Sequence, residues 1–299
     1  MLAEWRTPAT AALVQRCNFP PARSAVTCAV SGGADSMTLM VLALAADCDV
    51  TVVHVDHGIR AGSAAEAAVV AAAANRFGAA FRAVQVQVQP GPNLEARARD
   101  ARYAVLAPDV LTGHTADDQA ETVLINVLRG AAGPGLSGMR PGVRRPLLGI
   151  RRTTTHDFCK ALGIELVTDP SNLDPSFLRN RVRHELLPSM NELAKRDLVP
   201  ILTRQADVLR DDGDLLDELA ANLDPSDAKA LVRAPVPLAR RAVRRWIGGD
   251  HPPDAATVER VMNVARGHAT GCEIGNGRRI ERTRQRLRLV PGTAAPPTQ

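Results

Sequence analysis

Residues 25–46 join a short apolar run, a serine–glycine turn and an apolar helix-forming stretch, and this order constrains the fold more than any other feature. Residues 25–30 are apolar and rich in β-branched types, which predicts a buried strand. The turn Ser31-Gly32-Gly33 follows, and either Asp35 or Ser36 is placed to cap the helix, which we expect from about residue 37. Two glycines let the backbone approach an anion closely, and the free N–H groups of a helix start point at it. The stretch therefore predicts a phosphate-binding loop.

No lysine lies near this turn, so it is not a Walker loop. A carboxylate at position 35 is the natural partner for Mg²⁺, which binds nucleotides through one or two carboxylates plus phosphate oxygens. The segment Ser31–Ser36 reads Ser-Gly-Gly-Ala-Asp-Ser and resembles the PP-loop of the ATP pyrophosphatase superfamily. That resemblance implies cleavage between the α and β phosphates of ATP, adenylation of an acceptor and release of pyrophosphate. The residues expected to hold ATP are Ser31, Gly32, Gly33, Ala34, Asp35 and Ser36, with Asp35 also the Mg²⁺ ligand.

Strand and helix patterns alternate through the first two thirds of the chain. Further strands are expected at residues 49–56, 80–88 and 110–113, each separated from the next by a helical stretch. This order predicts an α/β fold, a Rossmann-like parallel sheet with helices on both faces. Ligands of such sheets bind at the carboxyl ends of the strands. Ser31, His54, Asp56 and His114 are all expected there. We assign His54 and His114 to the nucleotide site, while packing at the sheet end would explain His54 equally well.

The sequence pattern changes near residue 196. From there helical periodicity predominates, and a small strand pair is expected at the end. A chain of 299 residues is long enough for two cores, so we expect one domain over residues 1–195 and a mainly helical one over 196–299. No apolar run reaches the ~20 residues of a membrane span, and nothing suggests secretion, so a cytoplasmic protein without a membrane partner is expected. The five cysteines are scattered and contain no C-x-x-C pair, which argues against zinc sites and disulfide frameworks.

A second motif, His114-Thr115-Ala116-Asp117-Asp118-Gln119-Ala120-Glu121, follows the fourth strand and opens a helix. Helical spacing places His114, Asp118 and Glu121 on one face, with Asp117 beside them. Carboxylates at a helix start often only complement its dipole, which is worth about 0.3–1 kcal/mol each. Their place beside the predicted phosphate loop favours a cationic substrate or a second metal instead.

Arginine supplies almost all of the positive charge, because the chain has only three lysines and a net charge of +5. Arginine forks match phosphate geometry, which makes a nucleic-acid partner plausible. Arg99 and Arg102 lie on a basic helix expected around residues 93–107, and Arg284, Arg286 and Arg288 share one face of the last strand. A solvated helix face and a charge-guarded edge strand would explain the same residues.

With these motifs in place, residues 25–190 resemble the bacterial tRNA(Ile)-lysidine synthetase family. Four segments carry the resemblance: Ser31–Ser36; residues 54–58; residues 114–122 with the glycine-rich loop after them; and Asp169-Pro170-Ser171-Asn172 with Arg179-Asn180-Arg181-Val182-Arg183. The resemblance implies that ATP adenylates the wobble cytidine of a tRNA(Ile) with a CAU anticodon, and that L-lysine then displaces AMP to give lysidine.

The same resemblance implies roles for particular residues. Asp35, Asp118, Glu121 and Arg183 are the catalytic candidates, and Asp118 and Glu121 would hold the lysine ammonium group. The candidates for contacts with tRNA are Arg99, Arg102, Arg179, Arg284, Arg286 and Arg288. Residues 1–195 would then be the adenylation domain and residues 196–299 a tRNA-binding domain, in a chain that admits a homodimer.

Two other functions fit the same loop. One is a different PP-loop enzyme: a tRNA thiolase, which the missing C-x-x-C pair disfavours, or an amide-forming synthetase such as NAD or GMP synthetase, which the basic tail disfavours. The other is a non-enzymatic module that binds ATP and RNA, which the carboxylates beside the loop disfavour.

Overall fold

The computed structural model of the chain describes residues 5–56, 63–86, 105–249 and 253–291. The chain divides into two compact units, residues 1–207 and 208–299, and each is described by itself. Among the described residues, no helix is both long enough and apolar enough to cross a membrane.

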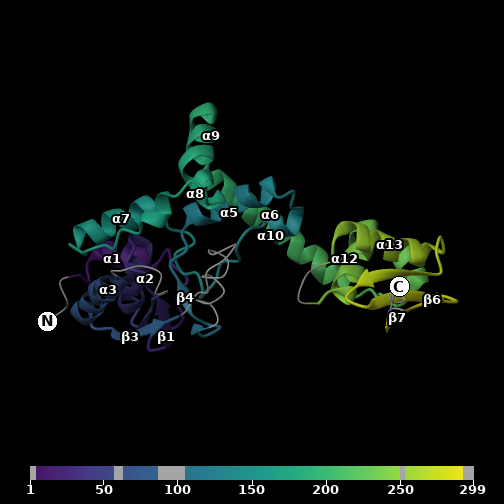
Figure 1. The fold of residues 1–299 in the computed structure, drawn as a ribbon, viewed down its shortest axis with the longest axis horizontal. Helices are drawn as coiled ribbons and strands as arrows, with labels where there is room; N and C mark the ends of the chain where they lie inside the picture. Colours follow the sequence, from purple (N-terminus) through teal and green to yellow (C-terminus); the bar gives the residue numbers. More distant parts are fainter. Residues whose placement is uncertain (1–4, 57–62, 87–104, 250–252, 292–299) are drawn as a thin grey trace, which may run out of the picture. The chain divides into compact units, whose positions relative to one another are not determined.

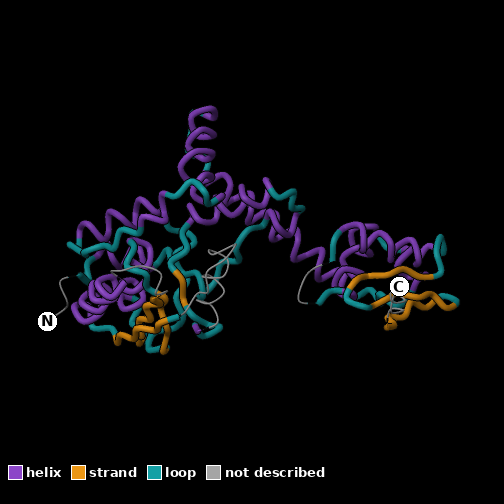
Figure 2. Tube along the Cα trace, in the orientation of Figure 1, coloured by secondary structure: helices purple, strands orange, loops and turns teal. Residues whose placement is uncertain are grey.

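The N-terminal unit is built on a parallel sheet of four strands in the order β3-β2-β1-β4 (Figures 1 and 2). The expected parallel α/β sheet is therefore confirmed. Because β1 is central, the turn that follows it opens at the middle of the sheet's carboxyl edge, between the ends of β2 and β4. The strands are β1 (Ala25–Ala29), β2 (Asp49–Asp56), β3 (Ala80–Gln85) and β4 (Leu111–Thr112).

Helices pack on this sheet around one apolar core, and the helices at residues 116–128, 187–194 and 199–221 pack on one another around a separate, smaller core. The helix α2 is buried along nearly its whole length, because it lies between the strands and α7. The basic helix expected around residues 93–107 lies largely outside the described residues. The helices are α1 (Pro8–Val14), α2 (Ala34–Ala45), α3 (Ser63–Phe77), α5 (Ala116–Leu128), α6 (Gly133–Leu136), α7 (Arg152–Ala161), α8 (Leu178–Arg181), α9 (Leu187–Ala194) and α10 (Val199–Ala221), which runs into the second unit.

The C-terminal unit packs three helices against an antiparallel sheet with the order β5-β6-β7. Its core includes Ile280 and Leu287, which are fully buried. Three strands occur where a pair was expected, because Arg284 adopts a left-handed φ of 58° and makes a second tight turn that its residue type did not signal. The elements are α11 (Ala228–Arg233), α12 (Val236–Ile247), α13 (Ala255–Arg266), β5 (Gly271–Gly275), β6 (Arg278–Thr283) and β7 (Arg286–Pro291).

Candidate active site

The turn that the sequence predicts to bind phosphate lies between β1 and α2. The helix begins at Ala34 with Gly33 as its N-cap, three residues earlier than the sequence suggested, so neither Asp35 nor Ser36 caps it. Gly33 has no side chain to bond the first N–H groups of the helix, which leaves them available to an anion. The Ser36 hydroxyl instead donates to the carbonyl of Gly33 at 2.9 Å and accepts from the Ser31 N–H at 3.2 Å, which holds the loop closed.

Two glycines let other segments approach this loop closely. Gly32 has a φ of +93°, and a Cβ there would lie 2.5 Å from a methyl group of Val167. A Cβ at Gly113, just after β4, would lie 2.8 Å from the backbone carbonyl oxygen of Asp35. The side chain of Val167 and the end of β4 therefore pack directly against the loop, and neither Gly32 nor Gly113 has room for a side chain.

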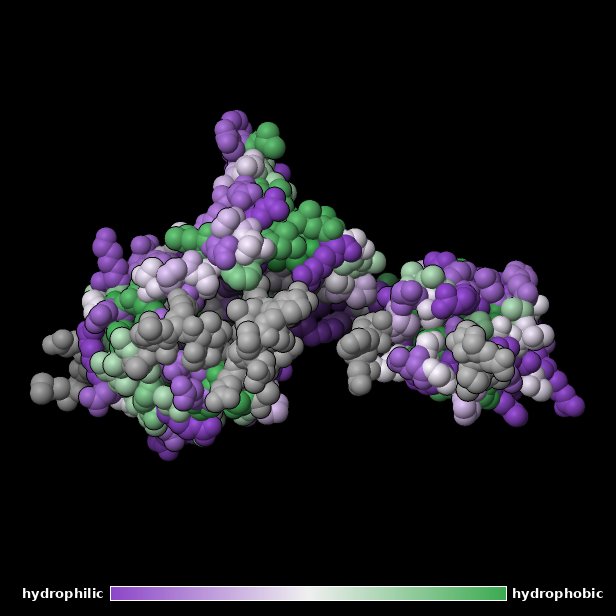
Figure 3. All heavy atoms as spheres, in the orientation of Figure 1, coloured by the Kyte–Doolittle hydropathy of each residue, from purple (hydrophilic) through white to green (hydrophobic). Residues whose placement is uncertain are grey.

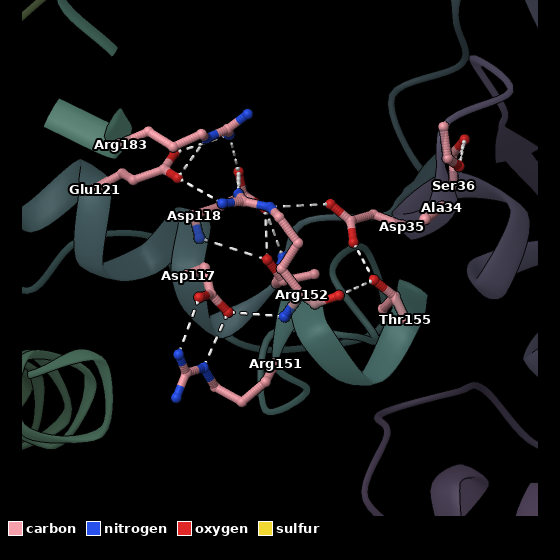
Figure 4. Close-up of polar contacts among 12 residues, drawn as sticks. Ala34, Asp35, Ser36, Asp117, Asp118, Glu121, Arg151, Arg152, Thr155 and Arg183 are labelled. Atoms are coloured by element: carbon pink, nitrogen blue, oxygen red, sulfur yellow. Dashed lines mark hydrogen bonds and ion pairs between the residues drawn. The ribbon is translucent and has the colours of Figure 1, made fainter. Parts of the chain in front are cut away.

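Asp35 lies in the first turn of α2 and points towards the start of α7 (Figure 4). The Thr155 hydroxyl bonds one of its carboxylate oxygens, and Arg152 Nε lies 3.5 Å from the other. Burial raises the pKa of Asp35, while Thr155 and Arg152 act in the opposite direction. Its side chain remains 25% exposed, so Asp35 is accessible from solvent beside its cationic partner Arg152.

Asp118 and Glu121, one helical turn apart on α5, face a group of three arginines (Figure 4). Glu121 has no exposed side-chain surface, and its two oxygens accept from Arg152, Arg179 and Arg183 at 2.7–3.0 Å. Asp118 Oδ1 accepts from the same three guanidinium groups at 2.9–3.3 Å. We call these five residues the arginine–carboxylate cluster. It carries a formal charge of +1, so it is not simply an acidic site.

The other oxygen of Asp118 has a structural role. Asp118 Oδ2 accepts from both the N–H and the hydroxyl of Thr115 at 2.8 Å, which forms a capping box at the start of α5. Burial alone would raise the pKa of Asp118, but Arg152, Arg179 and the Thr115 N–H lower it well below its usual range. Burial would likewise lower the pKa of Arg152, but Asp118 and Glu121 raise it above its usual value. Asp118 and Arg152 therefore each stabilise the charged form of the other.

Asp117 binds a different arginine. Its carboxylate accepts from Arg151 Nε at 3.0 Å and from the Arg152 N–H at 2.8 Å, while Arg151 also bonds Asp197. The sequence reasoning missed Arg151, Arg152 and Thr155, which sit at the start of α7. A signal was present, because two adjacent cations at a helix N-terminus oppose the helix dipole and need anionic partners to be stable there.

The glycine-rich loop after α5 is bonded to this helix. The Gln119 side chain both donates to the carbonyl of Met139 at 3.0 Å and accepts from its N–H at 2.7 Å. Asn126 donates to the carbonyl of Gly135 at 2.7 Å. Because Gln119 lies between Asp118 and Glu121 in the sequence, the loop is anchored to the helix that carries the cluster.

The remaining predicted site residues fall in several places. His54 is buried, and its Nδ1 lies 2.9 Å from the carbonyl oxygen of Val30, at the end of β1. His114 is half-buried with its Nδ1 2.8 Å from the Thr112 hydroxyl. Arg99 and Arg102 lie outside the described residues. The arginines of the last strand do not share one face, because Arg284 lies in the turn before β7, while Arg286 and Arg288 are exposed on the strand.

The fold and this loop together define a PP-loop protein, and residues 8–190 match the family described as the PP-loop domain. Relatives from Nocardia farcinica and Rhodococcus erythropolis, both described as tRNA(Ile)-lysidine synthase, are 39% identical to this chain. The alignments cover 91% of this chain and 93% of the first relative, and 96% of both chains for the second. A relative of the same description from Mycolicibacterium paratuberculosis is 42% identical over 73% of each chain. The chain belongs to the tRNA(Ile)-lysidine synthase family.

A solved structure shares the fold at low identity. The structure is that of a U34-tRNA thiolase from Methanococcus maripaludis with its [4Fe-4S] cluster, 16% identical to this chain, with a TM-score of 0.53. The match covers 68% of this chain and 79% of the thiolase.

Proposed function

We propose that this chain forms lysidine on tRNA(Ile) with ATP. The C2 oxygen of the wobble cytidine attacks the α-phosphate, which releases pyrophosphate and leaves an adenylated base. The side-chain amine of L-lysine then attacks C2, loses a proton, and AMP departs with the oxygen. The observation that supports this most strongly is a PP-loop flanked by the arginine–carboxylate cluster, in a chain that matches lysidine synthases over nearly its full length.

ATP and Mg²⁺ fit the residues at the loop. The first N–H groups of α2, with Ser31–Ser36 around them, would hold the phosphates. Asp35 offers a partly exposed carboxylate oxygen, which suits Mg²⁺ when nucleotide oxygens supply further ligands. When bound, the ion would offset the negative charge of the phosphates. We keep His54 and His114 as residues at the edge of the nucleotide site, where they lie beside the ends of β1 and β4.

The arginine–carboxylate cluster would serve the second step. Arg183, with Arg179, would stabilise the negative charge of the departing AMP phosphate. Asp118 and Glu121 would attract the lysine ammonium group. Both carboxylates already accept guanidinium N–H groups, so the ammonium must take over a hydrogen-bond position from an arginine.

The C-terminal region, residues 196–299, would bind the tRNA, and residues 1–195 would carry out adenylation. Figure 3 shows hydrophilic side chains over much of the viewed face of the C-terminal unit. Arg284 and Arg288 are exposed residues of this unit, whereas Arg286 is paired with Asp224 at 2.6 Å. The proposal also includes Arg99 and Arg102 as contacts with the tRNA. It includes a homodimer as the assembly of the chain.

The test combines purified chain, Mg·ATP, labelled L-lysine and tRNA(Ile) with a CAU anticodon. We expect tRNA-dependent pyrophosphate release and label in the tRNA, and both signals should disappear in Asp35→Ala. Pyrophosphate release without lysine would retain adenylation and reject lysine as the nucleophile. Sulfur transfer to the tRNA would indicate a thiolase, and ATP binding without tRNA-dependent pyrophosphate release would indicate a binding module.

A further inference from the structure

Arg152 connects the phosphate-binding loop to the carboxylates of α5. Its three guanidinium nitrogens face three different carboxylates: Nε lies 3.5 Å from Asp35, Nη2 lies 2.9 Å from Asp118 and Nη1 lies 2.8 Å from Glu121 (Figure 4). Its side chain is only 19% exposed, so solvent screens these interactions weakly. One guanidinium group therefore shares its charge between the nucleotide loop and the proposed lysine site.

We propose that Arg152 is a positioning residue that makes Mg·ATP and L-lysine antagonise each other's binding. The inference rests on the proposed function, because it takes Asp35 as the metal ligand and Asp118 with Glu121 as the ammonium site. It adds a role for a residue at the start of α7 and an order for the two chemical steps.

The three contacts differ in strength, and this difference sets the direction of the effect. The contact with Asp35 is the longest and is an ion pair without a hydrogen bond, whereas those with Asp118 and Glu121 are hydrogen-bonded. A cation bound at Asp35 repels the guanidinium and takes its partner, so Arg152 bonds the α5 carboxylates more fully. An ammonium group then finds these carboxylates better neutralised and binds less tightly.

The reverse follows from thermodynamic linkage, since coupling between two sites is reciprocal. An ammonium group at Asp118 and Glu121 displaces Arg152 towards Asp35, where it competes with the metal of Mg·ATP. The antagonism ends when pyrophosphate leaves with its metal, because Arg152 can then return to Asp35. The arrangement therefore favours adenylation first and lysine attack second.

The experiment measures binding without turnover. The Kd of α,β-methylene-ATP with Mg²⁺ is determined by calorimetry, with and without saturating L-lysine, for the wild-type chain and for Arg152→Gln. We expect lysine to raise the wild-type Kd about 5-fold, at the lower end of measured couplings, and to leave that of Arg152→Gln nearly unchanged. Arg151→Gln is the matched control, because it removes the same charge from the same helix start. Arg151 pairs with Asp117 and Asp197 instead of the three carboxylates, so this variant should keep the wild-type ratio of Kd values.

Arg152→Lys covers the case in which the glutamine variant does not fold. It keeps the charge, but a single ammonium nitrogen cannot face three carboxylates separately, so the ratio should fall below 2-fold. A wild-type ratio of one, or an undiminished ratio in the Arg152 variants, would overturn the proposal. Lysidine formation by the wild-type chain is measured separately, so a failed coupling with intact lysidine formation rejects this inference and not the proposed function.

Discussion

Asp118 illustrates how one carboxylate serves two purposes. Oδ2 completes the capping box of α5, and Oδ1 accepts from three arginines. The two oxygens are thus fixed from opposite sides, which orients the guanidinium groups before any ligand arrives. Such orientation matters because preorganised charges stabilise a transition state without a cost of rearrangement.

The lowered pKa of Asp118 predicts how stability depends on pH. As the pH falls below about 4, the unfolded chain takes up a proton at this carboxylate before the folded chain does, so the free energy of unfolding decreases. Asp118→Asn should remove this contribution and flatten the acid limb. It should also cost about 3–5 kcal/mol at pH 7, because it breaks a buried ion-pair network.

Urea unfolding followed by circular dichroism from pH 3 to pH 7 checks this prediction. The control is Asp157→Asn, which neutralises an exposed carboxylate on α7 and should change the free energy of unfolding by less than about 0.5 kcal/mol. An acid limb in Asp118→Asn as steep as that of the wild type would show that other groups control acid unfolding.

At the scale of elements, the sequence predicts the parallel sheet well, because its strands are local runs of apolar or, for β3, alternating residues. The range of β2 was predicted without error, and β1 and β4 differ by one or two residues at their ends. The start of α2 was misplaced because a glycine N-cap carries no side-chain signal. The third C-terminal strand was missed because it depends on a left-handed arginine at position 284.

The candidate site was only partly predictable for a related reason. The PP-loop and the carboxylates of α5 are contiguous motifs, so the sequence revealed them. The contact of Arg152 with Asp35, Asp118 and Glu121 joins residues far apart in the chain. Only the folded structure brings them together, and the packing of α7 on α2 accounts for the approach of Arg152 to Asp35.

The strand β7 allows a direct test of its proposed contact with tRNA. Arg288 is exposed there, and Arg288→Gln should remove one phosphate contact, which lowers the slope of log K against log salt by about 1. The measurement is tRNA binding by fluorescence anisotropy at salt concentrations from about 50 to about 200 mM. Counterion release changes the affinity strongly over roughly this range.

Arg241→Gln is the control for that experiment. It removes the same charge from α12, but Arg241 is paired with Asp217 at 2.5 Å, so the slope should stay at the wild-type value. An equal loss of slope in both variants would mean that tRNA responds to net charge alone and would remove β7 from the binding surface.

For the whole molecule, the proposed function needs two parts to act together. The PP-loop would support adenylation of the wobble cytidine, and the arginine–carboxylate cluster would bind the lysine amine. Both lie in the N-terminal unit, and the proposed tRNA contacts at residues 284–288 lie in the C-terminal one. The complete chain is therefore the object to test, with tRNA as the substrate rather than an isolated nucleoside.

The most direct measurement is mass spectrometry of nucleosides from tRNA(Ile) with a CAU anticodon, after incubation with the chain, Mg·ATP and L-lysine. The account predicts that the first anticodon nucleoside becomes a cytidine joined to lysine with loss of water. One AMP should form for each such nucleoside, and Asp35→Ala should form neither. An unmodified cytidine after incubation with a folded wild-type chain that binds both ATP and the tRNA would contradict the account.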